Sequence, residues 1–189
     1  MTSKRLLILG VGNVLMGDEG VGVHAVTRMQ TDHTWPEGIT LVDGGTGGFH
    51  LLSLLQEHDP VIMIDATADG RPPGTVGVLT PRFASDFPPS LSAHDIGLRD
   101  LVEATVLLGH LPDIHLVTVS IGEVAPMYLT LSRDVERAVP RVIGFVRALA
   151  TALVSCATID GCTSSVSPRA SSTSCGSTSL TARPIPSAV

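Results

Sequence analysis

Aromatic side chains and cysteines are scarce in this sequence, and each shortage excludes a class of protein. Aromatic residues make up 3% of the 189 positions, so leucine, valine and isoleucine must fill the interior. Cysteine occurs three times, at Cys156, Cys162 and Cys175, which is an odd number in a polar C-terminal segment. A disulfide framework is therefore not expected, and the cytoplasm is the compartment that we expect.

Positive charge and long apolar runs are scarce as well. Twelve lysines and arginines stand against 18 aspartates and glutamates, which gives a formal net charge of -6 without a basic stripe. This balance argues against a nucleic-acid partner. The apolar stretch 142–154 is interrupted by Arg147 and is shorter than the ~18 residues that a membrane span needs. We therefore expect no membrane insertion.

Short apolar runs that alternate with helical patterns make up most of the chain. Their order predicts an α/β fold, a three-layer sandwich in which a mostly parallel, twisted five-stranded sheet has helices on both faces. The run 75–80 follows 61–66 without a helix between them, so we expect it to be an antiparallel edge strand. The expected strands are 5–11, 39–43, 61–66, 75–80 and 114–121, and the expected helices are 18–30, 46–58, 92–109 and about 132–153.

The last predicted helix and the segment after it differ in composition. The helix carries a single apolar stripe, and Pro140 inside it predicts a kink or a later start. After it, 15 of the last 35 residues are serine or threonine and none is aromatic. Such a segment cannot bury enough apolar surface to offset its ordering entropy. We expect 1–154 to be the folded domain and 155–189 to be a disordered tail that stability and activity do not require.

Polar residues that could act in catalysis or bind a metal follow several of the predicted strands. In open α/β sheets, sites form beyond the carboxyl ends of the strands, where we expect the loop 10–19, the segment 43–48 and Asp65 to meet. His94 lies near the start of the third long helical pattern. Glu19, Asp65 and His94 would supply two carboxylates and one imidazole from exposed loop ends, a ligand set for a hard or borderline metal with open positions.

The glycine-rich loop after the first strand resembles a phosphate-binding loop only in part. Gly10 and Gly12 fit the dinucleotide fingerprint, but Leu15 takes the place of its third glycine. Asp18 and Glu19 follow, and their carboxylates would repel a phosphate at a helix N-terminus. A nucleotide-binding module with a degenerate Rossmann loop remains an alternative. The plain structural alternative is that Asp18 caps the helix, Glu19 lies in its first turn, and Asp65 and His94 are a turn residue and a satisfied histidine.

Four segments together resemble the signature segments of the hydrogenase maturation endopeptidases. They are LGVGNVLMGDEGVG at 9–22, DGGTGG at 43–48, VIMIDA at 61–66 and SAHDIGL at 92–98. The first, with its G-x-G-N-x-L-x-x-D-[DE]-x-x-G pattern, is specific, whereas the histidine segment alone is less so. The resemblance covers about residues 5–153 in the same order and at similar spacing.

This resemblance implies a function, a partner and a set of site residues. Members of the family remove a C-terminal extension from the precursor of the [NiFe] hydrogenase large subunit after nickel insertion, and they are grouped with aspartic-type peptidases. Glu19, Asp65 and His94 match the metal-contacting and catalytic positions. Asp43 matches a position near the cleft, and we expect it to contact the substrate together with its neighbours Gly44, Gly45 and Thr46. The nickel is expected to arrive with the substrate and not to be held tightly by the enzyme.

Two questions stay open at the level of the sequence. Either a metal ion or a carboxylate can activate the water that hydrolyses the peptide bond. A metal-sensing chaperone that docks on a hydrogenase precursor without cutting it would need the same residues.

Overall fold

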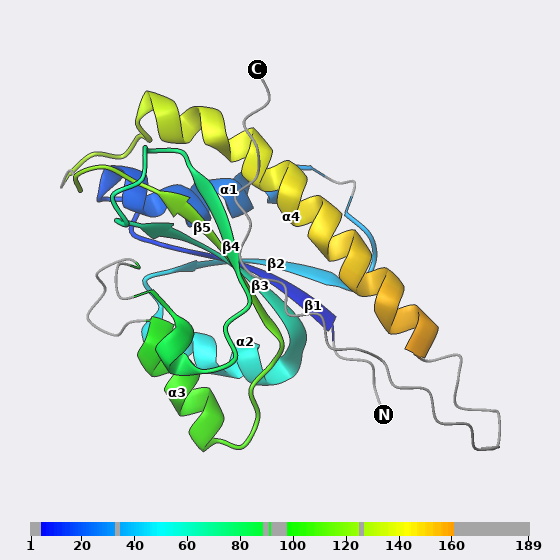
Figure 1. The fold of residues 1–189 in the computed structure, drawn as a ribbon. Helices are drawn as coiled ribbons and strands as arrows, with labels where there is room; N and C mark the ends of the chain where they lie inside the picture. The colour runs from blue at the N-terminus through cyan, green and yellow to red at the C-terminus, as the bar shows by residue number, and fades with distance from the viewer. Residues whose placement is uncertain (1–4, 33–34, 89–90, 92–97, 125–126, 161–189) are drawn as a thin grey trace, which may run out of the picture.

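The computed structural model of the chain describes residues 5–32, 35–88, 91, 98–124 and 127–160 (Figure 1). The strands are β1 Arg5–Val11, β2 Ile39–Gly45, β3 His58–Thr67, β4 Val76–Leu79 and β5 Ile114–Ser120. The α-helices are α1 Val21–Gln30, α2 Leu52–Glu57, α3 Leu98–Leu107 and α4 Arg133–Asp160, and the 3-10 turns are η1 Gly17–Gly20, η2 Gly48–Leu51 and η3 Ala84–Asp86.

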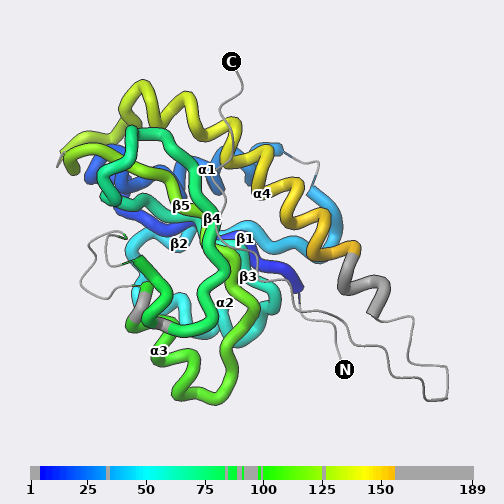
Figure 2. The backbone as a smooth tube through the Cα atoms, viewed as in Figure 1, coloured from blue at the N-terminus to red at the C-terminus, as the bar shows by residue number. Residues whose placement is uncertain are grey.

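The five strands form one sheet in the order β2-β1-β3-β5-β4. Neighbouring strands are parallel except β4, which pairs with β5 in the antiparallel sense at the edge of the sheet. Helices α1 and α4 lie on one face of the sheet, and α2 and α3 lie on the other (Figures 1 and 2). The predicted three-layer α/β sandwich with one antiparallel edge strand is therefore confirmed.

Side chains of the central strands point alternately to the two faces of the sheet and so form two layers of the core. In β3, Ile62 and Ile64 face the cluster that contains the α1 and α4 side chains. Val61 and Met63 face the cluster that contains side chains of α2 and α3. All four are fully buried, as expected for a strand whose two faces are both covered by helices.

Helix α4 is longer than the sequence indicated. It begins seven residues before Pro140 and continues through it, so the later start is wrong, while the change of direction along its first turns is consistent with the kink (Figure 1). It ends at Asp160, beyond the predicted end at Leu153, and so takes in the first residues of the predicted tail. The remainder, 161–189, lies outside the described residues.

The apolar composition of α4 has an explanation in its packing. By length and composition this helix could cross a membrane. However, its stripe of Val135, Val139, Val142 and Val146 is completely buried in the layer that also contains α1. Packing against α1 and the sheet therefore accounts for the apolar stripe, whereas only 28% of the most apolar window of Arg133–Ser155 is buried.

Two other predicted helices begin or end differently in the structure. Within 18–30 the first turn is the separate 3-10 turn η1, and α1 starts only at Val21. Within 46–58, Gly48 has a φ of 49° and the 3-10 turn η2 starts there, while His58 already belongs to β3. The N-terminal part of the predicted helix 92–109 falls on residues 92–97, which are outside the described part of the chain.

An ion pair joins α1 to α4 on the solvent side and gives a testable pH dependence. Arg28 Nη2 donates to both carboxylate oxygens of Glu136 at 2.8 Å. That hydrogen bond, with the charges of Arg28 and His24, outweighs the effect of burial and lowers the pKa of Glu136 below its ordinary 4.5. A carboxyl group with a lowered pKa in the folded state stabilises the fold above pH 4.5, and this contribution is lost as the pH falls through the folded-state pKa.

We therefore expect Glu136→Gln to lower the free energy of unfolding at neutral pH by less than about 1 kcal/mol, because both side chains are nearly half exposed. The difference from wild type should shrink to zero in acid. Urea denaturation of the two proteins at a series of pH values measures this. A difference that is unchanged in acid would show that the effect is not ionic.

Candidate active site

The carboxyl ends of the central strands lie side by side at one end of the sheet. We define the carboxyl edge as this end, where β1, β2, β3 and β5 terminate. Gly10 of β1 is paired with Asp43 of β2 on one side and with Ile64 of β3 on the other. Asp65, the next residue of β3, is paired with Thr118 of β5. The polar residues at and just beyond the carboxyl ends of β1, β2 and β3 therefore lie at the same edge, where a parallel sheet forms its sites.

Two glycines allow the loop after β1 to fold back onto this edge. Gly12 has a φ of 138°, and a Cβ atom there would lie 2.0 Å from the carbonyl oxygen of Glu19. At Gly22, a Cβ atom would lie 2.2 Å from the carbonyl oxygen of Ile64. Only residues without a side chain permit these approaches. As a result η1, which carries Glu19, contacts β3.

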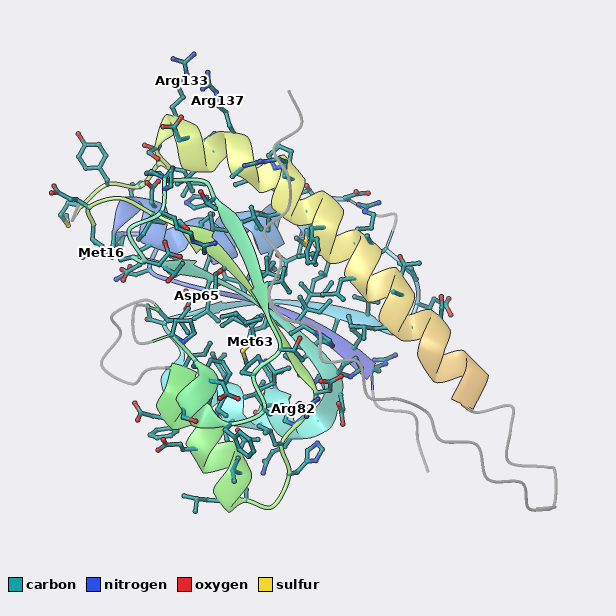
Figure 3. The ribbon with its side chains drawn as sticks, in the orientation of Figure 1. Met16, Met63, Asp65, Arg82, Arg133 and Arg137 are labelled. Atoms are coloured by element: carbon teal, nitrogen blue, oxygen red, sulfur yellow. The ribbon has the colours of Figure 1, made fainter. Side chains whose placement is uncertain are left out.

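Asp65 lies within β3, two residues before the strand ends at Thr67. Because side chains alternate along a strand, Asp65 points to the same face as Met63, the face that α2 and α3 cover (Figure 3). Its Oδ1 accepts a hydrogen bond of 2.8 Å from the backbone N–H of Ala66. Its place in the strand and this hydrogen bond together orient the carboxyl group.

The expectation that Glu19 and Asp65 lie on exposed loop ends is wrong. Glu19 is 4% exposed and Asp65 is 0% exposed. The reason is that β3 continues past Asp65 and that η1 folds back against the sheet. Carboxylates are rarely buried to this degree unless hydrogen bonds or a cation stabilise them. Glu19 and Asp65 lie in η1 and β3, which contact each other. Two buried carboxyl groups at one end of the sheet distinguish this place from the rest of the described residues.

The last residues of β2 form a turn that is hydrogen-bonded to the loop after β1. Asp43 is exposed, and its Oδ1 accepts a 2.9 Å hydrogen bond from the N–H of Gly45. The carbonyl of Gly45 in turn accepts a 3.0 Å bond from Gly12 N–H. Gly44 is buried, and a Cβ atom there would lie 2.8 Å from Leu9 Cδ1. The exposed Thr46 follows, so the predicted substrate-contacting residues border the edge, and their role stays a prediction.

Asp18 does not cap the helix that follows it, contrary to the plain structural interpretation. The residue at the N-cap of α1 is Gly20, and no side chain caps that helix. Instead Asp18 Oδ1 accepts a 2.6 Å hydrogen bond from the N–H of Ser132, the residue just before α4. The Gly17 N–H donates to the Tyr128 carbonyl at 2.7 Å. The segment 127–132 thus borders the candidate site, although no sequence pattern indicated it.

His94 falls in the segment 92–97, which lies outside the described residues. Before that segment, Leu91 forms an antiparallel bridge with Thr67, and Thr67 lies two residues after Asp65 in β3. After that segment, α3 starts at Leu98. Within the described ranges, no group of three histidine, cysteine, aspartate or glutamate side chains could hold a metal ion. The three-residue set with His94 therefore stays a prediction.

A further carboxylate at this edge, Asp69, has structural partners. Asp69 follows β3 and accepts hydrogen bonds from Arg71 Nε at 2.7 Å and from Ser120 Oγ at 3.2 Å. Burial raises the pKa of Asp69, but the hydrogen bonds from Arg71 and Ser120 and the charge of Arg71 outweigh it, and the pKa lies below its ordinary value. Asp69 is therefore a carboxylate that joins the β3–β4 connection to the end of β5.

Comparison with known proteins finds one family model, described as hydrogenase maturation protease, that matches residues 23–148. The hydrogenase expression/formation protein HupD of Rhodobacter capsulatus is 39% identical over 111 residues, which are 58% of this chain and 53% of that protein. Among solved structures, the hydrogenase maturating endopeptidase HybD from Escherichia coli has a TM-score of 0.69 at 32% identity and covers 77% of this chain and 91% of that one. The [NiFe] hydrogenase maturation protease HybD from Thermococcus kodakarensis has a TM-score of 0.64 at 26% identity, covering 77% and 99%.

The matched residues cover more than half of the chain but not the whole candidate site. Asp65 and His94 lie inside the range 23–148, and Glu19 lies just before it. The chain spans only 53%, 56% and 61% of the length of three curated relatives.

Proposed function

Because the chain belongs to the hydrogenase maturation protease family, we propose that it is an endopeptidase that removes the C-terminal extension of a [NiFe] hydrogenase large-subunit precursor. The observation that carries this proposal is the pair of buried carboxyl groups, Glu19 and Asp65, at the carboxyl edge of the sheet. The proposal includes the cytoplasm as the compartment and the precursor as the protein partner.

The two carboxyl groups suit the hydrolysis of a peptide bond. Hydrolysis needs a base that takes a proton from water, and a carboxylate within hydrogen-bond reach can do so. We assign this role to Asp65 or Glu19, which is the aspartic-type chemistry. Two carboxylates at one end of the sheet also supply oxygen ligands that suit a hard or borderline cation. Nickel carried by the precursor would be that cation, with His94 as the third contact.

This arrangement predicts that processing depends on nickel in the substrate. The enzyme should cut the nickel-loaded precursor and should leave both the nickel-free precursor and a free peptide spanning the junction uncut, because the nickel of the loaded substrate supplies the cation that Glu19, Asp65 and His94 would contact. A gel mobility shift that separates precursor from product measures this. Efficient cleavage of the nickel-free precursor would overturn the nickel dependence while leaving the peptidase assignment in place.

The same assay addresses the two alternatives. A metal-sensing chaperone would bind the loaded precursor without producing the shorter product. A nucleotide-binding module would be stabilised by NAD(P) or ATP in a thermal-shift measurement. We favour the peptidase over that module because the acidic turn η1 directly precedes α1, at the place where a phosphate would need the helix N-terminus.

A further inference from the structure

Two loops beside the candidate site expose large apolar side chains to solvent. Met127 is 84% exposed and Tyr128 is 63% exposed, and three neighbours are also exposed. The segments 13–17 and 127–132 contain no charged residue, in a chain whose net charge is -6. Exposed apolar groups that cluster in this way mark surfaces that bind a partner. We define the apolar patch as Val14, Leu15, Met127, Tyr128 and Leu129.

Backbone contacts join the two loops to each other and to the candidate site. Met16 forms a parallel bridge with Tyr128, and the next residue, Gly17, donates its N–H to the Tyr128 carbonyl at 2.7 Å. Gly17 also begins η1, the turn that carries Glu19. Figure 3 shows Met16 and Asp65 at the same end of the sheet. The apolar patch is therefore continuous with the edge where the peptide bond would be cut.

The backbone of Met127 has the left-handed conformation, which is strained for a residue with a side chain. Its φ is 64°, and among the residues that the structure describes it is the one non-glycine residue with a positive φ. The left-handed conformation costs an L-residue roughly 1–2 kcal/mol. A side chain that is 84% exposed offers almost no buried contact to offset that cost. Strain of this kind persists where a functional surface requires it.

We propose that the apolar patch is the docking surface for the folded body of the hydrogenase precursor, which places the C-terminal extension at Glu19 and Asp65. This inference rests on the proposed function and adds the surface that selects the substrate. The absence of charge on both loops points to an apolar area on the precursor. Tyrosine and methionine are enriched at such interfaces, where a few central side chains carry most of the binding energy.

The test compares two triple variants in kinetics with the nickel-loaded precursor. Leu15→Ser, Met127→Ser and Leu129→Ser together remove most of the apolar patch. Phe83→Ser, Leu107→Ser and Leu108→Ser together remove similarly exposed side chains outside it, at the end of α3 and in two loops. The patch variant should raise KM by about tenfold or more, with kcat at saturation within about twofold of wild type. The control variant should leave both constants unchanged, and melting temperatures should agree among all three proteins.

Every other outcome counts against the docking surface in a recognisable way. An unchanged KM in the patch variant overturns it while the peptidase assignment stands. A lower kcat at unchanged KM would mean that the loops only shape the carboxyl edge. Sedimentation velocity that shows a wild-type dimer, dissociated by the patch variant with unchanged precursor binding, would assign the patch to self-association.

Binding measured without cleavage separates this inference from the proposed function. If the wild type binds the loaded precursor but does not cut it, the peptidase assignment fails, and the affinities of the two triple variants decide the docking surface. If the wild type neither binds nor cuts the precursor, both proposals are overturned.

Discussion

Asp65→Asn is expected to reduce processing of the nickel-loaded precursor by at least about a hundredfold, the typical contribution of a positioned general base. Glu19→Gln is expected to do the same. Each change keeps the shape of a buried side chain and removes the carboxylate that would take the proton or contact the cation. The fold should persist, because each substitution replaces a buried charge with a neutral amide. Gel analysis of product formation and far-ultraviolet circular dichroism measure the two effects.

The matched control is Asp69→Asn, which changes a carboxylate at the same edge whose partners are Arg71 and Ser120. This variant should retain most of the activity and lose at most a little stability. Activity that survives in both the Asp65→Asn and the Glu19→Gln enzymes would remove these residues from the mechanism. Equal losses in all three variants would mean that the edge responds to net charge and not to particular carboxyl groups.

Gly22→Ala should destabilise the protein strongly, since the new Cβ atom would lie 2.2 Å from the Ile64 carbonyl oxygen and 2.3 Å from that of Val11. Both are backbone atoms of central strands and cannot rotate away, so α1 must move off the sheet. Overpacking of this kind costs about 3 kcal/mol. In a domain of this size that corresponds to a fall in Tm of about 6–12 °C. Activity should fall as well, because η1 carries Glu19 and precedes α1 directly.

Gly144→Ala serves as the control for the same chemical change. Gly144 is exposed in α4, and a Cβ atom there meets nothing within 4 Å. Alanine in an exposed helix interior should therefore raise stability by up to about 1 kcal/mol. Differential scanning calorimetry compares the three proteins. If Gly22→Ala melts at the wild-type temperature, the close approach of α1 to β1 and β3 does not limit stability.

Local patterns in the sequence were sufficient to predict the sheet. Each strand contains a short apolar run, and the runs of β1, β3 and β5 are almost completely buried. The missing helix between 61–66 and 75–80 was enough to predict the antiparallel edge strand. Element ends were less predictable. The end of α4 at Asp160 depends on helix propagation into a polar segment, where no apolar period marks the boundary.

The border of the candidate site could not be predicted, because it depends on contacts between distant parts of the chain. The plain structural alternative for Asp18 is a cap on the nearest helix, yet its hydrogen-bond partner Ser132 is 114 residues away. The burial of Glu19 depends on the folding back of η1 onto β3, which no spacing along the sequence reveals. The motifs predicted which residue types form the site, but they did not predict how deeply the side chains are buried.

The short antiparallel strand at the end of the sheet has a consequence for behaviour at high concentration. An unpaired strand edge is a template on which further copies can add and begin to aggregate. Here β4 offers only the four residues Val76–Leu79. The guanidinium of Arg71 lies beside its Gly77, about 3.1 Å from where a Cβ atom would be. A short edge strand beside a positively charged side chain disfavours pairing with strands of other molecules. Concentrated solutions should therefore resist fibril formation along this side.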